Sequence, residues 1–181
     1  MSDAMQPNRD DGCAVSGRAR LLGDDVNTDY IISSRRKRVT IDADELRPYL
    51  LEDYDKALGD SIVGGDVFVA GSNFGCGSAM EVAVTVVRAA GVSCVLAKSF
   101  ARAYYRNAIN NGLMPVICDT DGIDEGDDVR VFVDQGALKV RNVSKNVDID
   151  GGSLSPIMLD ILQAGGLTPY LRKHGDFVGL T

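Results

Sequence analysis

The chain has 181 residues, of which 45% are hydrophobic and 25% charged, and its formal net charge at pH 7 is −7. This length and composition indicate one globular domain that buries a core of its own. The acidic balance disfavours binding to nucleic acid or to an anionic membrane, and no apolar run is long enough to cross a bilayer.

The N-terminal segment is polar and has no apolar stretch of the kind found in secretory signals. We expect residues 1–16 to form a mobile leader and residues 17–181 to form the folded domain. The chain has four cysteines, Cys13, Cys76, Cys94 and Cys118. Their spacings match no metal-binding pattern, and the simplest location for such a chain is the reducing cytoplasm.

The first part of the domain is expected to consist of turns and short helices. Residues 23–32 combine a carboxylate-rich turn with an apolar Tyr-Ile-Ile run, which suits either a strand or a buried turn. Four consecutive cations follow at residues 35–38. Residues 41–54 have helical spacing but contain Pro48, so we expect short helices there.

The middle of the chain alternates short apolar runs with amphipathic segments. Strands are expected at 66–70, 92–97 and 113–118, and helices at 81–90 and 100–111. Right-handed crossovers would place these strands in a parallel sheet covered by helices. A β-hairpin and two closing helices are expected at 128–143, 156–163 and 167–174. The predicted fold class is α/β, with a parallel strand–helix core and a β-hairpin appendage.

The most informative stretch is residues 71–80, which read G-S-N-F-G-C-G-S-A-M between an expected strand and an expected helix. Its three glycines allow sharp turns and close approach of the backbone to another group. Ser78 is expected at or near the N-cap of the helix, with Glu81 at capping-box spacing. A helix start of this kind offers free N–H groups to a carboxylate or phosphate, but a plain helix cap has the same spacing.

Three residues are candidates for chemistry. Ser78 would be a strong base if nearby cations and N–H donors lowered the pKa of its hydroxyl. Arg35 could grip a carboxylate in a bidentate fork, or could belong to a solvated cationic loop. Asp29 could cap a turn or orient an arginine. These residues do not make a complete catalytic set, so catalysis by this chain would need a partner.

Four motifs together resemble the small subunit of 3-isopropylmalate dehydratase, which corresponds to the swivelling domain of aconitase. The motifs are G-D-D-V-N-T-D-Y-I-I at 23–32, N-F-G-C-G-S at 73–78, a long match at 90–116 and G-G-L-T-P-Y-L at 165–171. The resemblance covers about residues 17–175 and implies the swivelling β/β/α fold.

The resemblance also implies a partner, a cofactor and a reaction. The partner is a large subunit that holds a [4Fe–4S] cluster through three cysteines, so this chain would bind no cluster itself. The reaction is the reversible anti loss and re-addition of water on a hydroxy-dicarboxylic acid, as in leucine biosynthesis. Whether the isolated chain forms homo-oligomers is left open.

Site residues follow from the same resemblance. It places the general base at Ser78 and a carboxylate-binding arginine at Arg35. Further substrate contacts are assigned to Arg36, Gly77, Ala79 and Met80, and supporting positions to Thr28, Asp29 and Cys76.

The chain departs from the family pattern beside the proposed base. The common pattern G-S-S-R-E-H-A is G-S-A-M-E-V-A here, so Met80 stands where the family has an arginine that binds a substrate carboxylate. This difference has three interpretations. The substrate could carry an apolar group where the usual substrate has a carboxylate, or Arg36, Lys37 or Arg38 could supply the missing positive charge. The chain could also be a non-catalytic binding or regulatory subunit. The loop that would shape substrate choice also differs, with Ser33 in place of a proline.

Overall fold

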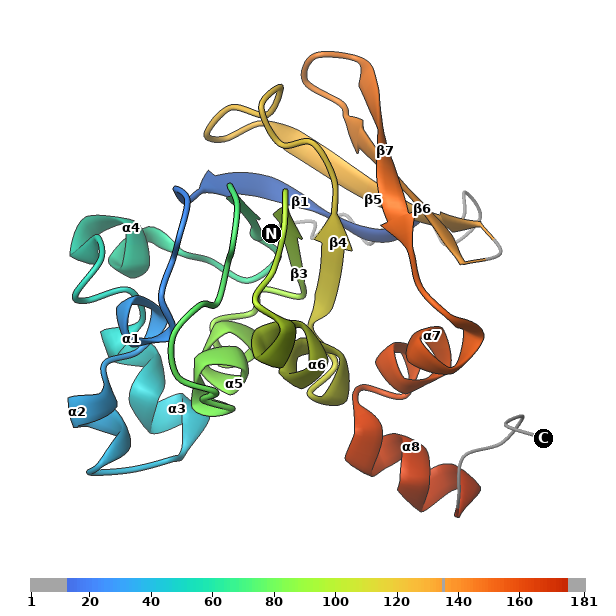
Figure 1. The fold of residues 1–181 in the computed structure, drawn as a ribbon. Coiled ribbons are helices and arrows are strands. Elements are labelled where there is room, and N and C mark those ends of the chain that lie inside the picture. The colour runs from blue at the N-terminus through green and yellow to red at the C-terminus, as the bar shows by residue number, and fades with distance from the viewer. Residues whose placement is uncertain (1–12, 135, 176–181) are drawn as a thin grey trace, which may run out of the picture.

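The computed structural model describes residues 13–134 and 136–175. Within these ranges one seven-stranded sheet runs through the molecule in the order β4-β3-β2-β1-β5-β6-β7 (Figure 1). The strands are β1 (Cys13–Leu21), β2 (Val67–Ala70), β3 (Cys94–Ala97), β4 (Met114–Ile117), β5 (Asp128–Asp134), β6 (Ala137–Asn142) and β7 (Val147–Ser153). Strands β1 to β4 are parallel, whereas β5, β6 and β7 join them antiparallel.

The parallel half confirms the predicted strand–helix alternation. Helix α5 (Val82–Ala89) joins β2 to β3, and helix α6 (Arg102–Asn110) joins β3 to β4. Every residue of β2 and β3 is buried, which is the burial expected of parallel strands covered on both faces. Their side chains alternate between two apolar clusters, with Phe68 and Val95 on one face and Val69 and Leu96 on the other.

Short helices lie between β1 and β2, as the proline in this region predicts. They are α1 (Thr28–Ile31), α2 (Ser34–Lys37), α3 (Ala43–Leu46), the 3₁₀ turn η1 (Arg47–Tyr49) and α4 (Lys56–Ser61). Pro48 lies in the 3₁₀ turn, where its missing N–H costs no helical hydrogen bond. The Tyr-Ile-Ile run left open by the sequence is a helical turn with Ile31 and Ile32 fully buried.

The C-terminal part confirms the hairpin and both closing helices. Helix α7 (Pro156–Gln163) packs on α6, and α8 (Leu167–His174) packs on α7 and α6 (Figure 1). Strand β7 was not predicted, because its sequence V-D-I-D-G-G-S has few apolar residues and two glycines, which weaken strand propensity. It forms because its backbone completes the pairing of β6.

The N-terminal boundary lies earlier than expected. Strand β1 begins at Cys13, so residues 13–16, assigned to the leader by the sequence, are part of the sheet. They pair with β5, including Val15 with Val131 and Ser16 with Arg130. This pairing with a strand more than a hundred residues away leaves no local signal in the sequence. The rest of the expected leader, residues 1–12, lies outside the described residues.

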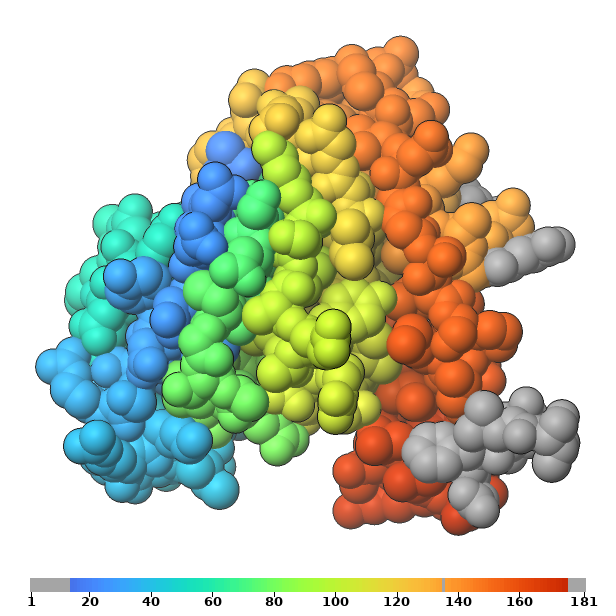
Figure 2. All heavy atoms as spheres, in the orientation of Figure 1, coloured from blue at the N-terminus to red at the C-terminus, as the bar shows by residue number. Residues whose placement is uncertain are grey.

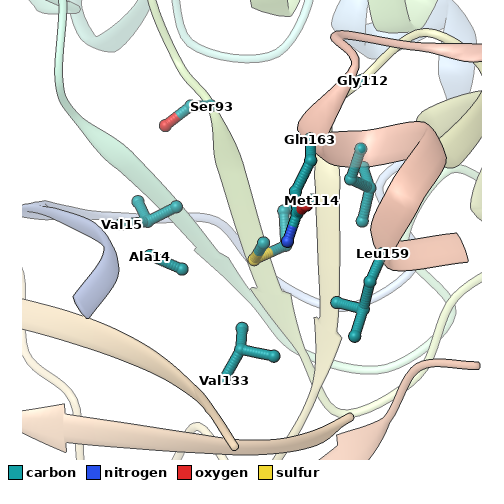
Figure 3. A pocket seen from close by; sticks show the side chains of 9 residues that line it. Ala14, Val15, Ser93, Gly112, Met114, Val133, Leu159 and Gln163 are labelled. Atoms are coloured by element: carbon teal, nitrogen blue, oxygen red, sulfur yellow. The ribbon is translucent and has the colours of Figure 1, made fainter. Parts of the chain in front are cut away.

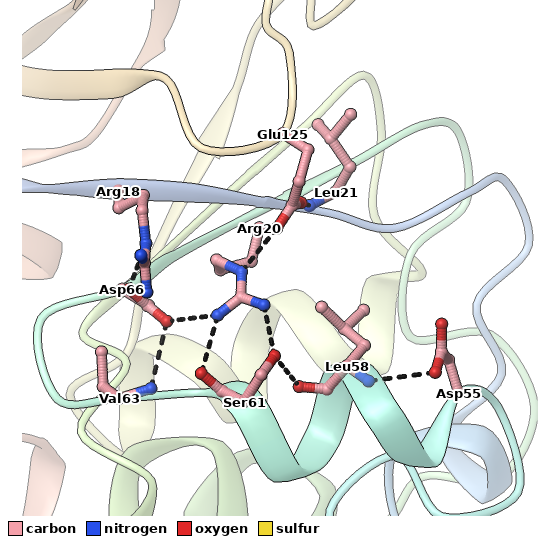
Figure 4. Close-up of polar contacts among 9 residues, drawn as sticks. All are labelled: Arg18, Arg20, Leu21, Asp55, Leu58, Ser61, Val63, Asp66 and Glu125. Atoms are coloured by element: carbon pink, nitrogen blue, oxygen red, sulfur yellow. Dashed lines mark hydrogen bonds and ion pairs between the residues drawn. The ribbon is translucent and has the colours of Figure 1, made fainter.

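A buried ion-pair network holds β1 to its surroundings (Figure 4). The guanidinium of Arg20 donates to Asp66 Oδ2 at 2.8 Å and to Glu125 Oε1 at 2.7 Å. It also donates to the carbonyl oxygen of Ser61 at 3.0 Å, which ties the end of α4 to the strand. Because Arg20 and Asp66 are both almost fully buried, each depends on the other for compensation of its charge.

We predict that Arg20→Ala lowers the free energy of unfolding by about 3 kcal/mol, because it leaves the buried Asp66 carboxylate without its main partner. Lys56→Ala removes an exposed i,i+4 pair with Asp60 and is the matched control, with an expected change below about 0.5 kcal/mol. Urea denaturation of the chain measures both. Equal losses for the two variants would contradict the role given to Arg20.

Candidate active site

Two loops lie side by side where β1 and β2 end, and their backbones are joined by hydrogen bonds. We call the paired residues 23–28 and 71–78 the loop seam. The bonds are Gly71 N to Gly23 O (3.1 Å), Asp25 N to Ser72 O (2.9 Å), Gly75 N to Val26 O (2.8 Å) and Thr28 N to Cys76 O (2.8 Å). The loop before α1 and the glycine turn before α5 therefore behave as one unit, seen side by side in blue and green in Figure 2.

Side chains strengthen the loop seam along its length. Asp24 Oδ1 accepts from Ser72 N at 2.6 Å, and Asn73 Nδ2 donates to Asp25 Oδ1 at 2.7 Å. At the far end, the hydroxyl of Thr28 donates to the carbonyl oxygen of Ser78 at 2.9 Å. The carboxylates of the first motif thus hold the glycine turn.

Glycine is required at two positions of the turn because neighbouring groups come too close for a side chain. A Cβ added at Gly75 would overlap the ring of Tyr104, and one added at Gly77 would lie 2.5 Å from Asn27 Oδ1. Both glycines also have positive φ, +77° and +89°, a region that L side chains rarely adopt. The predicted close approach is confirmed, and the approaching groups are Tyr104 and Asn27.

Ser78 is exposed on this turn, but it is not the N-cap of the helix. Helix α5 begins at Val82 and its N-cap is Glu81, which has helical backbone angles and makes no side-chain cap. The capping-box prediction is therefore wrong. The chain first passes through Met80, whose side chain is 3% exposed and belongs to an apolar cluster, so the helix starts only after this residue is buried. No hydrogen bond engages the Ser78 hydroxyl in the described part of the chain.

The burial of Met80 changes what can face a ligand at the turn. Gly77, Ser78 and Ala79 are exposed, whereas Met80 points into the core and presents no apolar surface to solvent in this conformation. The structure therefore exposes the proposed base Ser78 together with two of the predicted substrate contacts, Gly77 and Ala79, and buries a third, Met80. No feature of the sequence distinguishes a surface methionine from a buried one at this position.

The two candidate arginines of α2 differ in how firmly they are held. Arg35 is 72% exposed and donates through Nη2 to both oxygens of Asp53, at 3.0 and 3.1 Å, and through Nε to Ser33 Oγ. Arg36 forms two bonds with Glu52, at 2.8 and 2.9 Å, and stacks 3.7 Å over the ring of Tyr49. The hydrogen bonds that Arg36 donates to the Glu52 carboxylate raise the pKa of Arg36. Arg36 is thus held by both Glu52 and Tyr49, whereas Arg35 is more exposed and is paired with one carboxylate, that of Asp53.

Asp29 does not contact the guanidinium of Arg35. Its Oδ1 accepts from the amide of Ser34 at 3.0 Å, so it fixes the start of α2, the helix that carries Arg35. Lys37 and Arg38 are exposed, and neither makes an ion pair with a described residue.

Asn27 was missed as a site residue. Its side chain packs against Gly77 and accepts from the amide of Asp29 at 2.9 Å, which makes it the N-cap of α1. The Asn-Thr-Asp order ahead of a helical turn is a recognised N-cap signal that could have identified it.

Cavities also lie outside the exposed turn in the described part of the chain. One, of about 350 Å³, adjoins the loop seam and is lined by Asp24, Gly71, Lys98, Thr120 and Asp121 among others. Another, of about 610 Å³, is lined by residues of α3, η1 and α4, among them Arg47 and Asp60.

A further cavity, of about 490 Å³, is lined by Val15, Ser93, Met114, Leu159 and Gln163 among others, beside α7 (Figure 3). The residues around it are mostly apolar and include none of the predicted site residues.

Among residues 13–134 and 136–175, no group of three or more His, Cys, Asp or Glu side chains could hold a metal ion. None of the helices in those ranges combines the length and the apolar character that a bilayer crossing requires.

Known proteins are similar to this chain in sequence and in fold. A family model described as the aconitase C-terminal domain matches residues 42–121. The chain is 45% identical over 160 residues to 3-isopropylmalate dehydratase small subunit 2 of Archaeoglobus fulgidus, covering 88% of this chain and 96% of that one. It is 43% identical to the methanogen homoaconitase small subunit of Methanocaldococcus jannaschii, covering 88% and 92%.

A solved structure agrees with these sequence comparisons. The crystal structure of 3-isopropylmalate dehydratase (leuD) from Methanocaldococcus jannaschii superimposes with a TM-score of 0.83 at 43% identity, covering 89% of this chain and 95% of that one. The architecture is therefore that of the swivelling α/β domain found in aconitases. The chain belongs to the aconitase family, among the small subunits of the 3-isopropylmalate dehydratase and homoaconitase type.

Thiol reactivity tests how deeply each cysteine is buried. Burial raises the pKa of Cys118 to about 12 and raises the pKa of Cys94 further, so both stay neutral thiols at ordinary pH. Since the thiolate is the nucleophile, we predict that iodoacetamide at pH 8 modifies the half-buried Cys76 and spares Cys94 and Cys118. Mass spectrometry of a Cys13→Ser chain measures this, and in urea all three should react. Rapid modification of Cys94 in the folded chain would contradict the structure.

Proposed function

We propose that this chain is the small subunit of a two-subunit hydro-lyase that acts on a hydroxy-dicarboxylic acid or a close relative of one. The supporting observation is the exposed Ser78 hydroxyl, free of protein partners, on a turn held by the loop seam. The named relatives are small subunits, so a large subunit is the expected partner. The [4Fe–4S] cluster implied by the resemblance would belong to that subunit and would bind the departing hydroxyl.

In this proposal Ser78 removes the proton from the carbon next to a substrate carboxylate. A serine hydroxyl is a weak base unless its alkoxide is stabilised, and backbone N–H groups of Gly77 and Ala79 are suitably close in sequence to do so. The electron pair left on carbon expels the hydroxyl on the opposite face, which completes the dehydration. Re-addition of water with the hydroxyl on the other carbon completes an isomerisation.

Arg35 would bind a substrate carboxylate. Its present partner, Asp53, forms an exposed ion pair, a kind typically worth less than about 1 kcal/mol, so exchange for a substrate carboxylate costs little. Asp29 would support the site by holding the start of α2, and Cys76 by its place in the loop seam.

The substrate is proposed to differ from the one bound by family members with an arginine at position 80. Here Met80 is buried, so this position supplies neither a charge nor an exposed apolar contact. Lys37 and Arg38 remain candidates to replace the charge, whereas Arg36 is committed to Glu52. The absence of an arginine at position 80 also motivates a second candidate function, a non-catalytic regulatory subunit of such a complex.

We predict that Ser78→Ala lowers kcat by about 10²- to 10⁴-fold in the complex with its large subunit, because it removes the general base. Ser72→Ala, an exposed serine of the same glycine turn, is the control and should leave kcat near that of the wild type. The measurement is an anaerobic hydratase assay with a reconstituted cluster. Full activity of Ser78→Ala would remove Ser78 from this role.

The assay also decides between the two candidate functions. The substrates are 3-isopropylmalate, citrate, homocitrate, citramalate and dimethylmalate. Preference for an alkyl-substituted or smaller acid other than 3-isopropylmalate, such as citramalate or dimethylmalate, supports the altered-substrate proposal. A wild-type complex inert on all of them, with a large subunit whose turnover does not need this chain, favours the regulatory subunit instead.

We further predict that Arg35→Gln raises KM by about tenfold or more, because a hydrogen-bonded charge contributes on the order of 1.5–3 kcal/mol to carboxylate binding. Arg38→Gln tests the alternative source of charge on the same loop. Lys56→Gln, distant in sequence and exposed, is the control. An unchanged KM for Arg35→Gln together with a raised KM for Arg38→Gln would transfer the role to Arg38.

A further inference from the structure

Thr28 contacts the candidate turn at two points. Its side chain is 1% exposed, and its hydroxyl donates to the carbonyl oxygen of Ser78 at 2.9 Å. Its amide donates to the carbonyl oxygen of Cys76 at 2.8 Å. One residue from the first motif therefore holds two peptides of the turn, Cys76–Gly77 and Ser78–Ala79.

The hydroxyl of Thr28 carries one proton and has two acceptors within reach. The second, Asn27 Oδ1, lies at 3.5 Å, which is long for an O–H···O bond, whereas the Ser78 carbonyl lies at an ordinary distance. The proton therefore belongs to the bond with Ser78. Because Thr28 is buried, loss of this donor would leave the Ser78 carbonyl with an unmet acceptor beside the core.

This bond determines the direction of the next amide. The described chain has no cis peptide bond, so the Ala79 N–H is antiparallel to the Ser78 carbonyl. The carbonyl points inward to the buried Thr28, and the N–H consequently points outward, on the side where Ser78 and Ala79 are exposed. Among the described residues the Ala79 amide has no acceptor.

We propose that Thr28 is a positioning residue whose hydroxyl sets the Ser78–Ala79 peptide, so that the Ala79 N–H and the Ser78 hydroxyl face one ligand oxygen. This rests on the proposed function, and it adds to it the residue that orients the base and the donor beside it. Thr28 itself does not touch the ligand, because it lies beneath the turn.

Two substitutions separate the hydroxyl from the rest of the side chain. Thr28→Val keeps the shape and removes the donor, whereas Thr28→Ser keeps the donor and removes the methyl group. Thr120→Val is the matched control, because the Thr120 hydroxyl is also buried and donates to a carbonyl oxygen, that of Ala70, at the same distance of 2.9 Å. The Thr120 hydroxyl bonds the end of β2, and no hydrogen bond joins it to residues 77–79 in the described part of the chain.

Two measurements are made on each variant. In the isolated chain, the ¹³C carbonyl resonance of Ser78 should move upfield in Thr28→Val and stay in place in Thr28→Ser and Thr120→Val. In the complex with its large subunit, Thr28→Val should lower kcat by about tenfold to a hundredfold, as misplacement of a reacting group does, with a much smaller change in KM. Thr28→Ser and Thr120→Val should retain kcat within about threefold, well short of that loss.

Three results would overturn the proposal: an unmoved Ser78 resonance in Thr28→Val, an unchanged kcat in that variant, or equal losses in Thr28→Ser or Thr120→Val. The last would mean that packing or general stability, and not the hydroxyl, controls the turn. A wild-type complex without hydratase activity would instead defeat the proposed function, and the resonance in the isolated chain would still decide whether Thr28 holds the Ser78 carbonyl.

Discussion

The candidate site depends on the hydrogen-bonded pairing of two loops that leave neighbouring parallel strands. The backbone of residues 71–78 has little secondary structure of its own, and it is held in place by the carboxylates, amides and carbonyls of residues 23–28. Since loops without such partners are mobile, this pairing is what allows an exposed serine to have a defined orientation. The two glycines that permit the contact cannot be replaced without displacing Tyr104 or Asn27.

The sheet explains why those two loops meet. Strands β1 and β2 are parallel neighbours, so both segments leave the sheet at the same edge, directly before the loop seam. The Arg20 network fixes β1 just before this point by joining it to Asp66 at the start of β2 and to Glu125. Leu21, the next residue, donates its amide to the second oxygen of Glu125. Strand pairing and this ion-pair network therefore fix the ends of β1 and β2, from which the loop seam extends.

The sequence predicted the parallel core well because its signals are local. The apolar runs of β3 and β4 and the helical spacing of α6 each fall within a few residues of the structural bounds. The start of β1 and all of β7 were missed because they form by pairing with distant strands, which leaves no periodic signal. At the site, the glycine turn and the exposure of Ser78 follow from short motifs, whereas the delayed start of α5 follows from the burial of Met80.

The position of Met80 links the stability of the fold to the charge available for ligand binding. An arginine introduced there would have to leave the apolar cluster or place a guanidinium inside it, and an unpaired charge in a core is among the most destabilising changes known. Residue 80 is thus an anchor for the fold in this chain, whatever it contributes to binding in relatives. Replacement of Met80 by an arginine would therefore cost stability before it could supply a charge to a ligand.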